Sequence, residues 1–512
     1  MVNHRTDPPR PDPPPTPGVL EKAARLRKSW VRWLRRHGRP VSAILVVLVV
    51  VAGIVYWVVG RDGENACAAA GMEVVDGECI GVTDGAFTEF DDASTGVVEQ
   101  IRKQNAEVGD EYVNIALLGP LSQPRQSDKP GDRPRQGQLS SDQVRQMLIG
   151  AAIAQKRVNA GRVIGDPQPK VRLLLANQGG YQTRWRRPVE ELIARAGAED
   201  PHRRVVAVAA LGTSVADTRD AAMALSAARV PIIGAITTAD ELSYASIPGM
   251  LRVTPTTSEF VDALGTYLEP RPQYGPAIVV WDQNAEGRGD LYAGALQRAF
   301  HARLHRWIGD LPDQAYVGAS IPSESWPQMF DNVTINVCQS GANTILYAGR
   351  ITDLPAFIDS LELRICRDRP LTIMTGVTAL TAIDRGSAEE LRSAGLTVVY
   401  AGVTDPHRWP HGDGNPPGGW SDYSDALLAH GYRVTDSDAY TCLSHDAILT
   451  ATRAMRLAAA PNRLPKSVDV GGQLRNINGA YTVPGCSGSF SFTTMSNGAP
   501  LGTPIQIVTI PQ

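Results

Sequence analysis

Two pairs of hydroxyl side chains stand where this chain could hold a small anion. Thr213 and Ser214 follow the apolar run Val205–Ala210 and open a helical pattern, and Thr237 and Thr238 follow the next apolar run. Hydroxyls and backbone N–H groups at the electropositive N-terminus of a helix bind carboxylates. Ser and Thr also serve as helix N-caps, so a purely structural role for both pairs stays open.

Residue types suited to catalysis are present, but not in a working arrangement. His301 and His305 have a spacing that can hold zinc on a helix, but no Glu lies between them as in HExxH, and the neighbouring arginines would repel a cation. Ser444, His445 and Asp446 are triad residue types, yet neighbours in sequence cannot adopt the triad geometry. The chain also has no GxSxG or Walker A motif. We therefore expect no enzyme and no cofactor.

The elements that must position these residues alternate along the chain. From residue 112, short apolar runs alternate with helical patterns, which predicts parallel sheets covered by helices on both faces. A body of about 400 residues is too long for one core and predicts two α/β lobes. The predicted strands are 112–118, 171–176, 205–210, 231–236, 277–281, 344–347, 371–375 and 396–400, with antiparallel strands at 487–494 and 504–510. The predicted helices are 141–158, 187–195, 214–228, 290–304, 354–363, 388–394, 421–430 and 445–460.

An apolar run precedes this body. Residues 41–60 contain no charged side chain. As a helix this run is about 30 Å long, the thickness of the hydrocarbon core of a bilayer. Tyr56 and Trp57 lie near one end, where aromatic rings favour the membrane interface. The apolar region of a cleaved signal peptide is shorter, about 7–15 residues. The sequence predicts an uncleaved, single-pass transmembrane helix.

The charge distribution predicts the orientation of that helix. Residues 1–40 hold ten Lys or Arg and three acidic residues, a net charge of +7, and basic flanks stay cytoplasmic. We expect residues 1–20, rich in Pro, to be disordered, and residues 21–40 to form a basic amphipathic helix on anionic lipid. Because the whole chain carries −3, residues 61–512 carry −10, which argues against a nucleic-acid partner. We expect the body to lie outside the cell membrane.

All six cysteines lie beyond the apolar run. An even number on the outward side favours disulfides. Proximity in the sequence favours the pairs Cys67–Cys79, Cys338–Cys366 and Cys442–Cys486. No CxxC pair is present, so a metal site is poorly supported. Residues 61–104, in which the first pair encloses a hairpin, are expected to form an extracellular stalk.

Six short motifs occur in a characteristic order: 119–122 (GPLS), 211–214 (LGTS), 252–255 (RVTP), 281–289 (WDQNAEGRG), 347–350 (YAGR) and 445–447 (HDA). In this order they resemble the type I periplasmic binding proteins, especially the branched-chain amino-acid and amide receptors of ABC transport systems. The resemblance implies two lobes that are joined by three crossings and close on a small solute. It assigns 105–253 and 403–472 to lobe one, and 254–402 and 473–512 to lobe two.

The resemblance also places three departures from the family at ligand-facing positions of lobe two. Glu286 and Arg350 stand where the amino-acid receptors have aromatic residues, and Thr378 stands where they have the carboxylate that holds the ammonium group. A buried ammonium group without a carboxylate partner would cost several kcal/mol, so ordinary branched-chain amino acids are disfavoured. Arg350 suits an acidic or highly polar ligand. The alternatives are exposed charges, or a Glu286–Arg350 pair that closes the lobes without ligand.

Together these features predict a membrane-tethered solute-binding protein that closes on a small polar ligand: amino-acid-like, an amide or an organic acid. A transporter permease or a membrane sensor is the expected partner. The alternative is an interaction or scaffold module that retains the fold without a ligand. The insertion at 123–138, rich in Pro, Arg and Asp, favours this alternative, because the family has a short ligand-facing loop there.

Overall fold

The computed structural model describes residues 66–123, 137–161, 163–285, 289–318, 326–376, 387–405, 408–436 and 439–511. Ala66–Gln512 form one compact unit, separate from Met1–Asn65. Within the described ranges, no helix has both the length and the apolar character needed to cross a membrane. The predicted cytoplasmic tail and the predicted transmembrane helix at 41–60 lie outside those ranges, so both stay predictions.

The first sheet has seven strands in the order β1-β2-β4-β3-β5-β6-β7. Strands β3 to β7 are parallel, and β2 joins β4 in the antiparallel sense. The parallel strands β3 to β7 are largely apolar, as expected where helices cover both faces of a sheet. The strand bounds are β1 (Glu73–Val75), β2 (Glu78–Thr83), β3 (Tyr112–Gly119), β4 (Lys170–Asn177), β5 (Val205–Ala210), β6 (Ile232–Gly234) and β7 (Met250–Arg252).

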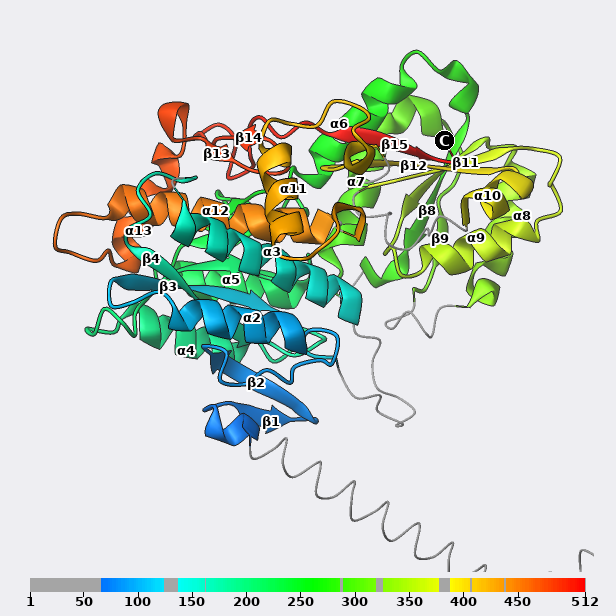
Figure 1. Cartoon of the computed structure of the whole chain (residues 1–512). Helices are drawn as coiled ribbons and strands as arrows, with labels where there is room; N and C mark the ends of the chain where they lie inside the picture. Colours follow the sequence, from blue (N-terminus) through cyan, green and yellow to red (C-terminus); the bar gives the residue numbers. More distant parts are fainter. Residues whose placement is uncertain are drawn as a thin grey trace, which may run out of the picture. The chain divides into compact units, whose positions relative to one another are not determined.

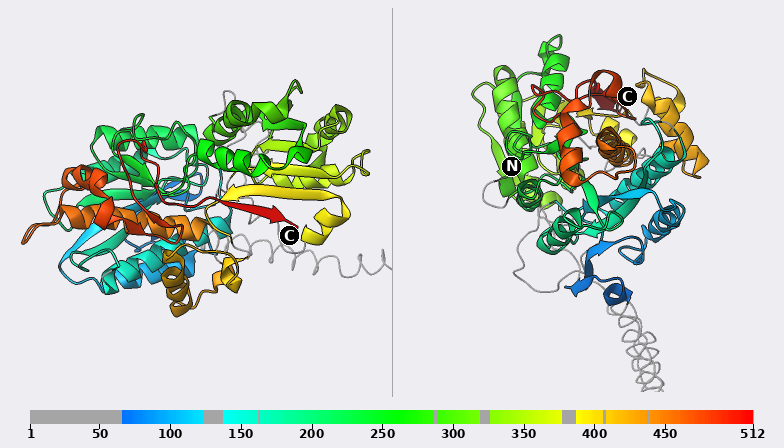
Figure 2. Two further views of the ribbon diagram at one scale, coloured as in Figure 1. Left: turned by 90° about the horizontal axis from the view of Figure 1, so that it is seen from above. Right: turned by 90° about the vertical axis from the view of Figure 1, so that its left-hand side faces the viewer.

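The second sheet has six strands in the order β15-β12-β11-β10-β8-β9. All pairs are parallel except β12–β15, in which Tyr400 faces Val508 in the antiparallel sense. Figure 2 shows this last strand, drawn in red, running beside the yellow strands of the second half of the molecule. The bounds are β8 (Ala277–Asp282), β9 (Gln314–Tyr316), β10 (Thr344–Ala348), β11 (Leu371–Thr375), β12 (Leu396–Gly402) and β15 (Gln506–Ile510).

Helices cover both faces of each sheet (Figure 1). On the first sheet, which with its helices we call lobe one, one face carries α2 (Thr95–Ala106), α3 (Ser141–Ala160), α12 (Ala439–Ala458) and α13 (Ser467–Gln473), and the other carries α4 (Arg186–Ala196) and α5 (Ala216–Ala227). On the second sheet, in lobe two, one face carries α6 (Thr257–Leu268) and α7 (Leu291–Ile308), and the other carries α8 (Asp331–Ser340), α9 (Leu354–Glu362) and α10 (Ser387–Ser393). The additional helix α11 (Gly419–Ala429) contacts α3.

The chain crosses between the lobes after β7, after β12 and before β15. Before the last crossing, the short pair β13 (Val483–Pro484) and β14 (Ser489–Phe490) lies against α12, and the backbone N–H of Arg252 donates to the Gly498 carbonyl at 2.9 Å. Within 473–511, β15 is the part that joins the second sheet. One hydrophobic cluster continues from the α3–α12 side of lobe one to the α6–α7 side of lobe two, so the two lobes share a packed contact.

The predicted strands and helices from residue 112 onward have counterparts in the structure, whereas the expected stalk does not stand apart. Strand β2 pairs with β4, and α2 packs on α3, so this segment belongs to lobe one. The reason is that Glu78–Thr83 is itself a buried run that extends the sheet. All three favoured cysteine pairs are formed: Cys67–Cys79, Cys338–Cys366 and Cys442–Cys486.

The close contact between α3 and α12 yields a stability prediction. A Cβ added to Gly150 of α3 would overlap the Thr441 carbonyl oxygen of α12. Gly150→Ala should therefore force two buried helices apart and lower the free energy of unfolding by at least about 2 kcal/mol. Gly96→Ala, at a helical position with open space around it, is the matched control and should be neutral or stabilising. Denaturant unfolding of both variants measures the difference; equal stabilities would contradict the packing.

Candidate functional site

The candidate site lies where strands of both sheets end. In open α/β sheets, ligands bind outside the carboxyl ends of the strands. The structure brings the residues after β5, β6 and β10 into contact, and these include the predicted residues Thr213, Ser214, Thr237, Thr238 and Arg350. The predicted residues Glu286 and Thr378 lie outside the described residues.

A strained turn after β5 carries the first hydroxyl pair. Ala210 and Leu211 both have a φ of 73°, which costs an L-residue about 1–3 kcal/mol. Gly212 follows with a φ of 97°, which glycine adopts readily. Gly212 has no room for a side chain, because a Cβ there would overlap Oε1 of Gln182. That same oxygen accepts the backbone N–H of Thr213 at 2.9 Å. Gln182, in the connection between β4 and α4, therefore holds this turn in place.

The hydroxyl of Thr213 is engaged by protein groups. It donates to the Gly137 carbonyl at 3.0 Å and accepts from Nε2 of Gln182 at 2.8 Å. Gly137 lies at the end of the insertion and sits so closely that a Cβ on it would be 2.5 Å from Oγ1 of Thr213. The end of the insertion therefore contacts the hydroxyl of Thr213, which was predicted to bind a carboxylate.

Ser214 joins the two hydroxyl pairs within lobe one. Its Oγ accepts the backbone N–H groups of Thr238 at 3.0 Å and Ala239 at 3.2 Å. The buried Arg252 supports the same loop by donating to the Ala239 carbonyl at 2.8 Å. By contrast, the hydroxyls of Thr237 and Thr238 are buried and have no hydrogen-bond partner among the described residues.

Arg350 reaches across from lobe two. Its Nε and Nη2 donate to both carboxylate oxygens of Asp290, at 2.7 and 2.8 Å, and Nη2 also donates to the Ser214 carbonyl at 3.0 Å. The Arg350 side chain is 15% exposed and that of Asp290 is fully buried. Burial alone would lower the pKa of Arg350, but the charge of Asp290 and its hydrogen bonds outweigh burial and raise this pKa. The predicted pairing of Arg350 with a carboxylate is thus made within the protein.

Three residues that sequence reasoning did not assign to the site complete this region: Gln182, Arg252 and Asp290. Asp290 had a readable signal, because an Asp directly before a helical pattern is a strong N-cap, and its Oδ1 does accept the Ala293 N–H at 3.1 Å. Its second role, as the partner of Arg350, had no signal in the sequence. The contact depends on how the turn before α7 meets the loop after β10, which no local pattern records.

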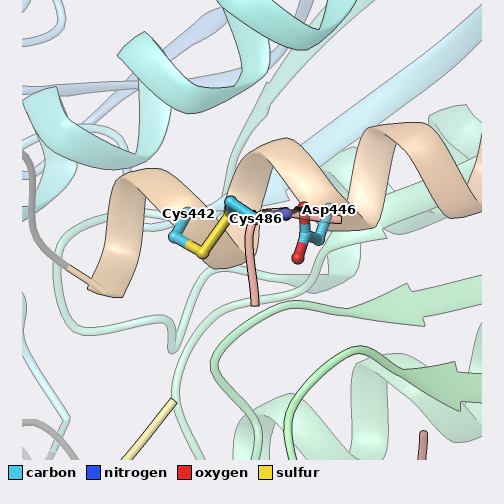
Figure 3. Close-up of side chains that lie close together, drawn as sticks. All are labelled: Cys442, Asp446 and Cys486. Atoms are coloured by element: carbon cyan, nitrogen blue, oxygen red, sulfur yellow. Dashed lines mark hydrogen bonds between the residues drawn. A yellow bond between two sulfur atoms is a disulfide. The ribbon is translucent and has the colours of Figure 1, made fainter. Parts of the chain in front are cut away.

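A second cluster, Cys442, Asp446 and Cys486, has ligand atoms within 4.8 Å of one another (Figure 3). The two sulfurs form a disulfide, so they are not thiolate ligands. The carboxylate of Asp446 already accepts four hydrogen bonds: from Nδ1–H of His445, from the N–H groups of Cys486 and Ser487, and from the Ser487 hydroxyl. The cluster therefore ties the loop after β13 to α12 and has no free ligand atoms for a metal.

His445 is held as a neutral ring in this cluster. Its Nδ1–H donates to Asp446 at 2.8 Å, so Nε2 accepts from Nη1 of Arg157, also at 2.8 Å. Burial lowers the pKa of His445, because the charged ring would be poorly solvated, and the nearby Arg157 lowers it further, although Asp446 opposes the shift. A lowered folded-state pKa means that stability is present above the unfolded pKa of about 6.5 and is lost as pH falls through it.

This linkage predicts the response to acid. Between about pH 6.5 and pH 5, His445 binds a proton in the unfolded chain but stays neutral in the folded chain. This difference lowers the free energy of unfolding by up to about 1.4 kcal/mol per pH unit. His445→Gln, whose amide can donate and accept, should flatten this slope. His305→Gln, an exposed histidine of α7, is the control and should keep it. Thermal unfolding across this range distinguishes them; parallel curves for the wild type and His445→Gln would contradict the assignment.

Comparison with known proteins places the fold. No protein-family model matches the sequence, and no curated protein sequence is significantly similar to it. Solved structures match well: an ABC transporter substrate-binding protein from Desulfitobacterium hafniense has 17% identity and a TM-score of 0.55, with 78% of this chain and 97% of that one covered. A leucine binding protein from Thermotoga maritima has 15% identity and a TM-score of 0.54, with 78% and 98% covered.

A third match is a solute binding protein of an ABC transporter from Rhodopseudomonas palustris in complex with p-hydroxybenzoic acid. It has 13% identity and a TM-score of 0.55, with 78% of this chain and 92% of that one covered. All three are solute-binding proteins of the type I periplasmic class. At these identities the likeness is one of fold, and it confirms the predicted resemblance at that level. The described body of this chain has the two-lobed α/β fold of the type I periplasmic binding proteins.

Proposed function

We propose that this chain is an extracytoplasmic solute-binding protein, tethered to the membrane by residues 41–60, whose lobes close on a small polar solute and serve a transporter or a membrane sensor. The fold supports this proposal, because almost the full length of several ABC-transporter substrate-binding proteins aligns with the body. The charge of the N-terminal residues and the apolar run support the tether.

The observation that carries the proposal is the pair of hydroxyls after β6. Thr237 and Thr238 are 0% and 3% exposed, and neither hydroxyl has a partner among the described residues. A buried hydroxyl left without a hydrogen bond costs about 1–3 kcal/mol, so a folded protein keeps such groups where something else satisfies them. Both lie at the carboxyl end of a strand, where solutes bind in sheets of this kind.

The chemistry of the neighbouring groups narrows the solute class. Thr213 and Ser214 are satisfied by protein groups, and the charge of Arg350 is neutralised by Asp290. Three of the groups predicted to hold an anion, Thr213, Ser214 and Arg350, are thus engaged, which favours a neutral amide or hydroxyl-bearing solute over a free amino acid or an organic acid. Glu286 and Thr378 remain predicted contacts of that solute.

Thermal unfolding of the full chain in detergent, in the presence of amides, sugars, amino acids and organic acids, tests the proposal. A solute at about 100 times its dissociation constant should add about 2.7 kcal/mol to the free energy of unfolding. Thr238→Val should abolish this gain while leaving the unliganded protein as stable as before or more so, because it removes an unsatisfied hydroxyl. Thr266→Val, at an exposed position of α6, is the control and should keep the full gain.

A scaffold that keeps the fold without a ligand is the second candidate. It is favoured by the carbonyl of Gly137, which covers Thr213 from the insertion. No stabilisation by any solute in a broad set, with Thr238→Val behaving like wild type, would support the scaffold and overturn the solute-binding proposal.

A further inference from the structure

Two helix N-termini from opposite lobes are bonded to each other. The first N–H groups of a helix have no partner within it. In α5 the N–H of Ala216 donates to the Gly289 carbonyl of lobe two at 2.9 Å, and in α7 the N–H of Tyr292 donates to the Ser214 carbonyl of lobe one at 3.2 Å. Between them, residues 215 and 290 form an antiparallel bridge. Each helix end is therefore satisfied by backbone of the other lobe.

The Arg350–Asp290 pair reinforces this exchange. Its geometry is bidentate, and Nη2 of Arg350 makes a further hydrogen bond to the Ser214 carbonyl, which also accepts the N–H of Tyr292. Asp290 is held for this task because it caps α7 through Ala293. Removing one partner of such a buried pair leaves an uncompensated charge, which is among the costliest single changes to a folded protein.

The backbone contact also leaves no room for a side chain. Gly289 has a φ of 81°, and a Cβ on it would lie 2.9 Å from the Cβ of Ala216 in the opposite lobe. A left-handed φ favours glycine, and the close approach requires it. A side chain at this position is therefore excluded while the two lobes are in contact.

We infer that these residues form an interlobe clasp that holds the lobes closed without any ligand. The clasp consists of Arg350, Asp290, Ser214, Ala216, Gly289 and Tyr292. Arg350 is then a positioning residue that sets the closed state, rather than a contact for an anionic solute. The inference rests on the proposed function in one respect, since it names the regulation of that same site: opening, not closure, is the step that admits a solute.

Hydrogen exchange followed by mass spectrometry on the full chain in detergent, without added solute, tests the clasp. The amides of Ala216 and Tyr292 report on it directly, because their partners lie in the other lobe. Both should be protected in the wild type. Arg350→Ala should speed their exchange at least about tenfold, while amides in the centre of β3 keep their rates. Arg350→Lys, which loses the bidentate fork, should fall between them.

The chain offers a matched control and a second way to open the clasp. Arg298 of α7 also pairs with a lobe-one residue, Glu241, but both side chains are exposed, so Arg298→Ala should leave the two amides protected. Gly289→Ala removes no polar group yet should speed exchange like Arg350→Ala, which guards against a folding defect specific to the arginine variant. Fast exchange at both amides in the wild type, or unchanged exchange in Arg350→Ala and Gly289→Ala, would overturn the clasp. The solute-induced stability gain is measured separately, so either idea can fail alone.

Discussion

The exchange of hydrogen bonds between the N-termini of α5 and α7 is the constraint around which the two lobes meet. Helix N-termini carry unsatisfied N–H groups and a partial positive charge, and in open α/β sheets they point to the edge where solutes bind. Here each of the two ends finds a carbonyl of the other lobe, at Gly289 and Ser214. The positive potential that remains is opposed by the buried carboxylate of Asp290, which Arg350 in turn neutralises.

Other features of the site follow from that contact. The carbonyl of Ser214 faces lobe two, and its hydroxyl accepts a hydrogen bond from the loop after β6. The hydroxyl of Thr213 is hydrogen-bonded to Gln182 and Gly137. The hydroxyls of Thr237 and Thr238 are buried and stay without a hydrogen-bond partner among the described residues. A shared fold with amino-acid receptors therefore does not imply a shared way of holding a ligand, because the same strand ends can serve different groups.

The sequence predicted most of the strands and helices, but it did not predict the side-chain contacts between them. The run Leu371–Thr375 was readable to the residue, since Pro370 and Gly376 bound this short buried strand. Helix α6 was missed although its signal was present, a capping box formed by Thr256 and Glu259 before an apolar stripe. The three-residue strands β7 and β9 are too short to show any period. Gln182 could not have been found, because a glutamine that braces a strained turn 31 residues further on looks like any polar loop residue.

The place of β15 has a consequence for how the molecule is made. It closes the edge of the second sheet beside β12, and along the chain it follows β12 only after α11, α12 and α13. Until β15 has been made, β12 is an edge strand with unpaired N–H and C=O groups, the kind of surface on which chains aggregate. The other strands of that sheet are parallel neighbours that need long crossovers and so assemble slowly. During synthesis, lobe two must therefore pass through an incomplete stage in which the edge at β12 stays unpaired until β15 has been made.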